Sequence, residues 1–130
     1  RKRLGRYLKG RPRAIMNYQW QGKQEEIQVY TDSDWAGCTK TGKSTSGGAI
    51  MMEQHWLKSW ASTQQSITLS SAEAELVAMC KASAEGIGMC NIMTDYDKQI
   101  WATAYADSSA AIAISKRRGS GKLRHINVGL

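Results

Sequence analysis

The chain has 130 residues, which suits one domain with a single hydrophobic core rather than two. Its formal net charge is +7, and its basic residues gather near both ends. This favours a polyanionic partner, although charge alone does not separate RNA from DNA or from an anionic membrane, and a solvated basic face that binds nothing stays open. No apolar run reaches the length of a membrane span, and the three cysteines form neither a metal-ligand spacing nor a disulfide framework, which favours reduced thiols in an intracellular setting.

The first half of the chain predicts a short helix followed by strands. Residues 1–10 place three apolar side chains at helical spacing, and residues 14–18 predict a short strand. Residues 27–32 predict a longer strand, because β-branched and aromatic types alternate there with other residues. A polar, glycine-rich segment at 37–48 is expected to be a loop whose last part begins the next strand. A β-hairpin then follows, with strands at 49–53 and 56–62.

The second half of the chain predicts a long helix, a strand and a short helix. The long helix spans Ser70 to about Ile92 and opens with a capping box, in which Ser70 caps and Glu73 reaches back to a free backbone amide. A strand at 100–106 and a helix at 109–116 follow. This order predicts an α/β layer with a mixed sheet whose first three strands form a meander. The expected apolar stripe of the long helix takes in Ala72, Leu76, Met79, Cys80, Ser83, Ile87 and Cys90.

Four acids stand out from those that are readily explained as solvated or as part of a cap: Asp32, Asp34, Glu75 and Asp107. The helical wheel does not select Glu75 over Glu73, and the capping role of Glu73 is the only tie-breaker. Two strand-end aspartates and one helix glutamate could meet at one edge of the sheet, where Mg²⁺ or Mn²⁺ would be needed to offset their repulsion. The alternative, that Asp32 and Asp107 are ordinary turn residues, is equally open from the spacing alone.

Four motifs then point to a known family: Y-T-D-S-D-W-A-G (30–37), K-S-T-S-G (43–47), L-S-S-A-E-A-E-L (69–76) and Y-A-D-S-S-A-A-I-A-I (105–114). In this order and spacing they resemble the ribonuclease H domain of Ty1/Copia-type retrotransposon Pol polyproteins. The stretch R-Y-L-K-G (6–10) is similar to the end of the preceding reverse transcriptase region. We therefore expect a segment of a longer polypeptide, with residues 1–18 ending the reverse transcriptase or connecting region. Residues 19–130 would form a ribonuclease H-like domain that lacks its last strand and helix.

The resemblance implies a ribonuclease H-like α/β fold, with a five-stranded mixed sheet flanked by helices and a site of four carboxylates that binds two Mg²⁺ ions, for which Mn²⁺ can substitute. Three of those carboxylates fall on Asp32, Glu75 and Asp107, and Asp34 is expected nearby. The fourth has no counterpart before the chain ends. Asn127, after His125, stands where the family usually has Asp, and Ser108 and Ser109 replace the common Asn-Gln pair. A surface or capping role is expected for His125.

The implied activity is hydrolysis of the RNA strand of RNA–DNA hybrids during reverse transcription. The expected partners are the hybrid and a reverse transcriptase domain of the same polyprotein, and no membrane partner is expected. The localisation expected is intracellular, in a cytoplasmic particle or the nucleus. One alternative is a decayed domain that only binds nucleic acid or tethers the polymerase, and another is a related nuclease, such as an integrase or resolvase, that cuts double-stranded DNA. The expected nucleic-acid contacts, besides the basic ends, are Lys43, Ser44, Ser46, Ser71, Ser108 and Ser109.

Overall fold

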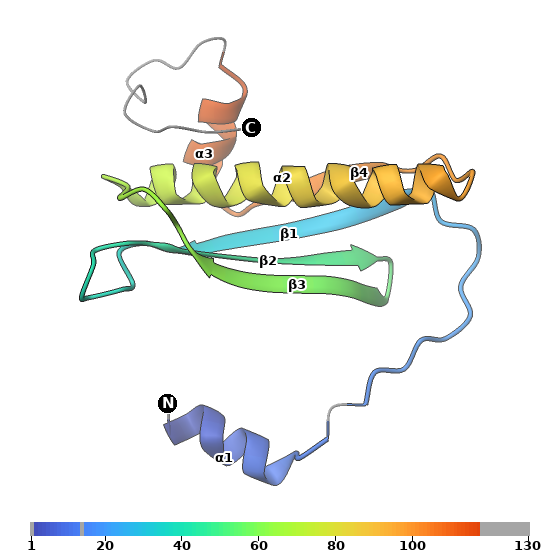
Figure 1. Ribbon diagram of the computed structural model, residues 1–130, viewed down its shortest axis with the longest axis horizontal. Helices are drawn as coiled ribbons and strands as arrows, with labels where there is room; N and C mark the ends of the chain where they lie inside the picture. Colours follow the sequence, from blue (N-terminus) through green and yellow to red (C-terminus); the bar gives the residue numbers. More distant parts are fainter. Residues whose placement is uncertain (1, 14, 118–130) are drawn as a thin grey trace.

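The computed structural model describes residues 2–13 and 15–117. These residues form three helices and four strands: α1 (Lys2–Gly10), β1 (Glu26–Asp34), β2 (Thr45–Met52), β3 (His55–Thr63), α2 (Ser71–Asp95), β4 (Trp101–Tyr105) and α3 (Ser109–Ser115) (Figure 1). The predicted α/β layer with a mixed sheet is confirmed, although several strand and helix ends shift by a few residues. None of the helices within the described part of the chain is long and apolar enough to cross a membrane.

The four strands form one mixed sheet in the order β3-β2-β1-β4. The first three strands pair antiparallel, as the predicted meander requires, and β4 pairs parallel to β1. This topology is compatible with a ribonuclease H-like fold. In the parallel pair Tyr30 lies opposite Tyr105. Asp32 and Asp107 each follow two residues after that pair, so both acids come to the same edge of the sheet.

The core lies between the sheet and α2. In β1 the side chains of Ile27, Val29 and Thr31 are buried, which confirms the predicted alternation. Ile27 and Val29 pack with Ile50 of β2 and with Ala82 of α2 in one cluster. In Figure 1 α2 runs along this face of the sheet, and α3 packs against α2. The strand therefore turns one set of side chains toward the helix and the alternate set away from it.

The predicted apolar stripe of α2 is wrong for most of its members, although Cys90 is half-buried and packs against the core. None of its seven members is buried, and Ile87 is 59% exposed. The buried positions on the sheet side are instead small residues four apart: Ala74, Ala78, Ala82 and Gly86. A Cβ atom at Gly86 would lie 3.0 Å from Val29 Cγ2 and 3.1 Å from Ala102 Cβ. The helix thus approaches the sheet so closely that only small side chains fit between them, a contact that a search for large apolar residues misses.

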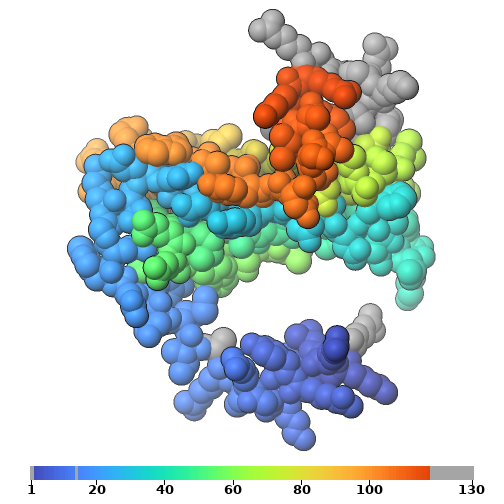
Figure 2. Space-filling view, turned by 180° about the vertical axis from the view of Figure 1, so that it is seen from behind, coloured from blue at the N-terminus to red at the C-terminus, as the bar shows by residue number. Residues whose placement is uncertain are grey.

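The strand predicted at residues 14–18 is also wrong over 15–18, which have no regular structure; residue 14 lies outside the described residues. The segment is attached to the β2–β3 hairpin by side chains and not by strand pairing. The Tyr18 hydroxyl donates a hydrogen bond to the Trp56 carbonyl (2.8 Å), and Gln21 Nε2 donates to the Met52 carbonyl (2.9 Å). The predicted first helix is confirmed as α1, whose side chains are all exposed and which contacts no other described helix or strand (Figure 2).

Candidate metal centre

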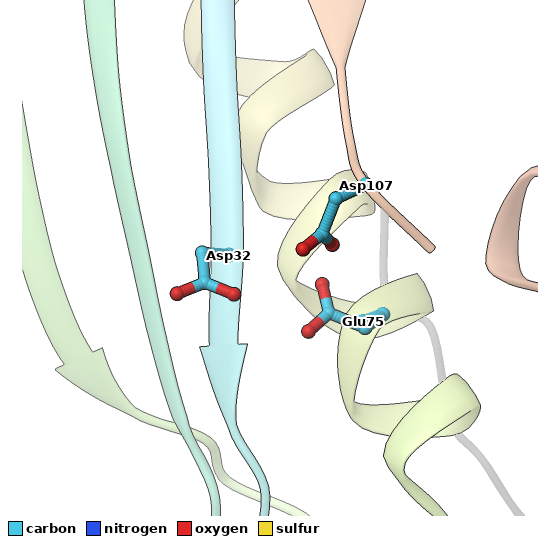
Figure 3. A group of neighbouring side chains, drawn as sticks. All are labelled: Asp32, Glu75 and Asp107. Carbon is cyan, nitrogen blue, oxygen red and sulfur yellow. The ribbon is translucent and has the colours of Figure 1, made fainter. Parts of the chain in front are cut away.

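Three acidic side chains from three separate elements meet at one edge of the sheet: Asp32 from β1, Glu75 from α2 and Asp107 from the residues just after β4 (Figure 3). One carboxylate oxygen of each lies within 4.8 Å of the corresponding oxygens of the other two. Asp32 and Asp107 are exposed, whereas Glu75 is buried. The site is therefore open to solvent on the side of the two aspartates and closed on the side of the helix.

The beginning of α2 determines which glutamate reaches this cluster. Ser70 is the N-cap, and its hydroxyl accepts a hydrogen bond from the Glu73 amide at 3.3 Å. The Glu73 carboxylate in turn accepts one from the Leu69 amide at 2.7 Å. The predicted capping box is thus confirmed, and it occupies Glu73. Two residues further along, Glu75 carries its carboxylate to the aspartates.

The Glu75 carboxylate is fixed at one oxygen and free at the other. Its Oε1 accepts two hydrogen bonds from Ser33, one from the amide at 3.1 Å and one from the hydroxyl at 2.8 Å. Its Oε2 is buried and has no hydrogen-bond partner among residues 2–13 and 15–117. A buried charged oxygen without a partner is costly, and a divalent cation would satisfy it. The donor set, made only of carboxylate oxygens, fits Mg²⁺ or Mn²⁺.

Ser33 is the residue of this site that the sequence patterns did not single out. The sequence nevertheless indicates which face of the strand Ser33 occupies, because residues of a strand alternate between its two faces. Thr31 faces the helix, so Ser33 faces it too, while Asp32 between them faces the other way. A hydroxyl between two aspartates, turned toward a helix that carries a glutamate, is well placed to donate a hydrogen bond to it.

Asp34 lies close by but is not a member of the cluster that Asp32, Glu75 and Asp107 form. It ends β1, and a turn follows in which Ala36 has a positive φ of 51°. A Cβ atom at Gly37 would collide with the Asp34 carboxylate, so a larger residue there would require that exposed side chain to move. The second aspartate of D-S-D therefore lies against the turn after the strand.

Two of the serines expected to contact nucleic acid lie in the interior. Ser44 has no exposed surface, and its hydroxyl accepts a hydrogen bond from the Ala36 amide (3.0 Å) and lies 2.9 Å from the Thr68 hydroxyl. Ser46 is 2% exposed, and its hydroxyl accepts a hydrogen bond from Gln64 Nε2 (2.9 Å). These hydroxyls connect the hairpin to the segment before α2, and neither has a surface that a ligand could reach.

The remaining expected contact residues have accessible side chains. Ser71 and Ser109 are exposed at the first positions of α2 and α3. Ser108 is partly exposed and caps α3, since its hydroxyl accepts a hydrogen bond from the Ala111 amide at 3.2 Å. Lys43 is partly exposed in the loop before β2. His125 and Asn127 lie outside the described residues.

The surface beside the carboxylates is a shallow depression rather than a deep pocket. Its lining includes Asp32, Asp107 and the rings of Tyr30 and Tyr105, which stack with centroids 5.2 Å apart. A larger hollow lies at the opposite end of β1 and contains none of the three clustered acids. An open surface of this kind suits a large, extended substrate better than a small molecule.

Comparisons with known proteins give relatives but no matching family model. The chain is 33% identical over 100 residues to the "Retrovirus-related Pol polyprotein from transposon RE2" of Arabidopsis thaliana, an alignment that covers 76% of the chain and 7% of that protein. It is 33% identical over 95 residues to the corresponding polyprotein from transposon RE1 of the same plant (72% of the chain, 6% of that protein). A third Arabidopsis relative, the "Uncharacterized mitochondrial protein AtMg00810", is 35% identical over 86 residues (65% of the chain, 35% of that protein).

These alignments cover most of the chain but only a small part of each relative. The chain spans less than a tenth of the length of either polyprotein and about a third of the mitochondrial protein. It is therefore similar to one short stretch of retrovirus-related transposon Pol polyproteins.

Proposed function

We propose that the chain belongs to the ribonuclease H region of a Ty1/Copia-type retrotransposon Pol polyprotein and hydrolyses the RNA strand of RNA–DNA hybrids with the help of divalent cations. The observation that carries this proposal is the meeting of Asp32, Glu75 and Asp107 within 4.8 Å of one another. The names of two relatives, both retrovirus-related Pol polyproteins, support the coarser part of this proposal, an origin in a Pol polyprotein. In this proposal residues 1–18 end the reverse transcriptase or connecting region, and the ribonuclease H-like domain begins at residue 19.

The three carboxylates would hold the cations, two Mg²⁺ ions or Mn²⁺ in their place. When bound, these ions would supply Lewis-acid stabilisation of the charge that develops on the phosphate and on the leaving oxygen. Glu75 would contribute a buried oxygen to which no group in the described part of the chain donates a hydrogen bond. The two exposed aspartates would contribute oxygens on the side where a nucleic acid can approach. The charges of these side chains would be balanced by the cations rather than by a basic residue.

The protein's own groups would otherwise bind and orient the substrate. The Ser33 hydroxyl already donates to Glu75, so it would position that acid and would not serve as a nucleophile. Ser71 lies one helical turn before Glu75, and Ser108 and Ser109 directly follow Asp107. All three serines are at least partly exposed, so their hydroxyls could contact 2′-hydroxyl groups of an RNA strand. Basic residues of α1 would add affinity for the phosphate backbone that does not depend on sequence.

A cleavage assay tests the proposal. A hybrid with a 5′-labelled RNA strand is incubated with the chain and Mg²⁺ or Mn²⁺, beside double-stranded DNA, double-stranded RNA and single-stranded RNA of the same sequence. We expect only weak metal-dependent shortening of the RNA, in the hybrid alone, because the chain supplies three of the four carboxylates that the resemblance implies, and we expect loss of this activity in EDTA and in Asp32→Asn. Asp34→Asn is the matched control, because it removes the same charge two residues away and outside the cluster.

Each other outcome of this assay contradicts a defined part of the proposal. Hybrid binding without metal-dependent products would favour a domain that only binds nucleic acid or tethers the polymerase. Cutting of double-stranded DNA would favour an integrase-like or resolvase-like nuclease. Equal loss of activity in Asp34→Asn and Asp32→Asn would show that activity does not depend specifically on the three clustered acids.

A further inference from the structure

The serine between the two aspartates joins β1 to α2 at the carboxylate cluster. The Ser33 amide and hydroxyl both donate hydrogen bonds to Glu75 Oε1, at 3.1 Å and 2.8 Å, across 42 residues of sequence. Ser33 is partly buried, and Glu75 is 8% exposed. Two donors from one residue to one oxygen restrict the rotation of a long side chain that would otherwise have several rotamers.

The two oxygens of Glu75 have different surroundings. Ser33 supplies two donors to Oε1, whereas the buried Oε2 has no hydrogen-bond partner among the described residues. The neighbouring residue, Asp32, sends its side chain to the opposite face of the same strand and joins the cluster from there. Asp32 thus belongs to the cluster, and its neighbour Ser33 binds Glu75, a second member. Movement of β1 would therefore shift both carboxylates together.

The helix that carries Glu75 is held by a separate contact. Gln64 Nε2 donates hydrogen bonds to the Ala74 carbonyl in the first turns of α2 and to the Ser46 hydroxyl of β2, each at 2.9 Å. The backbone next to Glu75 is therefore attached to the sheet without Ser33. Removal of the Ser33 hydroxyl should release the carboxylate of Glu75 and leave the helix in place.

We infer that Ser33 is a positioning residue for the metal centre, which orients the Glu75 carboxylate so that Oε2 faces a bound divalent cation. The inference rests on the proposed function, since it assumes that the three carboxylates bind such an ion. Groups that orient a metal ligand through a hydrogen bond commonly change metal affinity by about 10-fold to 100-fold when they are removed. Because the Ser33 amide remains as a donor in any variant, we expect a loss near the lower end of that range.

The test measures Mn²⁺ affinity of the full 130-residue chain by electron paramagnetic resonance of the free ion, so no catalytic activity is required. Ser33→Ala should weaken Mn²⁺ binding by about 10-fold. Ser33→Thr keeps the hydroxyl on a residue type that suits a strand, and it should restore affinity close to that of the unchanged chain. Ser59→Ala, at an exposed serine of β3, is the matched control and should bind Mn²⁺ normally.

A double-mutant cycle separates positioning from a general effect on the fold. In a Glu75→Ala background the Ser33→Ala change should have no further effect on Mn²⁺ binding, because the carboxylate on which Ser33 acts is gone. An equal loss in both backgrounds would overturn the inference, as would normal affinity in Ser33→Ala. If the unchanged chain binds no Mn²⁺, or if Asp32→Asn binds it as well as the unchanged chain does, the proposed metal centre fails and the inference falls with it.

Discussion

Replacing Asp32 with Asn should stabilise the protein when no metal is present. The substitution keeps the shape of the side chain but removes one of three negative charges that lie within 4.8 Å of one another. Coulomb's law at 4.8 Å gives about 0.9 kcal/mol of repulsion per pair in bulk water and about 3.5 kcal/mol at an effective dielectric constant near 20. Asp32 takes part in two of the three pairs and is exposed to solvent, which brings the estimate toward the water limit. We expect the free energy of unfolding in EDTA to rise by about 1 to 3 kcal/mol.

Thermal unfolding by circular dichroism, in EDTA and in a series of Mg²⁺ concentrations, measures this effect. In EDTA, Asp32→Asn should melt several degrees above the unchanged chain. Added Mg²⁺ should raise the melting temperature of the unchanged chain, because a ligand that binds only the folded state stabilises it, and should raise that of the variant much less. Asp34→Asn removes an equal charge outside the cluster and should show neither effect. If the variant melts below the unchanged chain in EDTA, repulsion within the cluster does not destabilise the protein. If it gains as much from Mg²⁺, Asp32 does not bind the ion.

Three further predictions concern the packing and the chemistry of the chain. Gly86→Ala should lower the free energy of unfolding by about 1 kcal/mol, because the added Cβ would press on the core. Gly88→Ala, at an exposed position of the same helix, should raise it by up to about 1 kcal/mol. If urea unfolding gives the reverse order, α2 does not approach the sheet as closely as described. Gln64→Met should lower the free energy of unfolding by about 1 to 3 kcal/mol, because the Ser46 hydroxyl and the Ala74 carbonyl lose their donor. An unchanged melting temperature in calorimetry would show that Gln64 does not attach α2 to the sheet. The pKa of Cys38 is lowered, mainly by a hydrogen bond from Thr41, while burial raises the pKa of the other two cysteines. As pH is raised from neutral, iodoacetamide should therefore modify Cys38 first, since the thiolate is the reactive form, and mass spectrometry showing the opposite order would contradict this assignment.

Local patterns in the sequence were sufficient for most of the fold. Alternation of β-branched residues over 27–32 located β1, and the serine and glutamate of the capping box located the start of α2. Both signals depend on residues close in sequence, whose geometry is determined by the element in which they lie. The capping box also helped at the site, because it accounted for Glu73 and left Glu75 as the acid that reaches the aspartates.

What the sequence did not reveal depends on contacts between distant residues. The face of α2 that packs on the sheet is made of alanines and Gly86, and hydrophobic periodicity gives such small residues little weight. Residues 14–18 have strand-like composition, but composition does not show whether a neighbouring strand accepts the pairing. The role of Ser33 depends on an acceptor 42 residues away. The burial of Ser44 and Ser46 likewise follows from the packing of the hairpin against the segment before α2.

The proposed metal centre requires that Asp32, Glu75 and Asp107 together bind a divalent cation. Crystals of the chain grown with Mn²⁺ and measured at the manganese absorption edge test it most directly, because the anomalous signal identifies the ion and its position. We predict an anomalous peak within coordination distance of an oxygen from each of the three carboxylates, with Glu75 coordinating through the oxygen that Ser33 leaves free. Manganese bound elsewhere, or three carboxylates that point apart with no ion between them, would show that these acids do not form a metal centre.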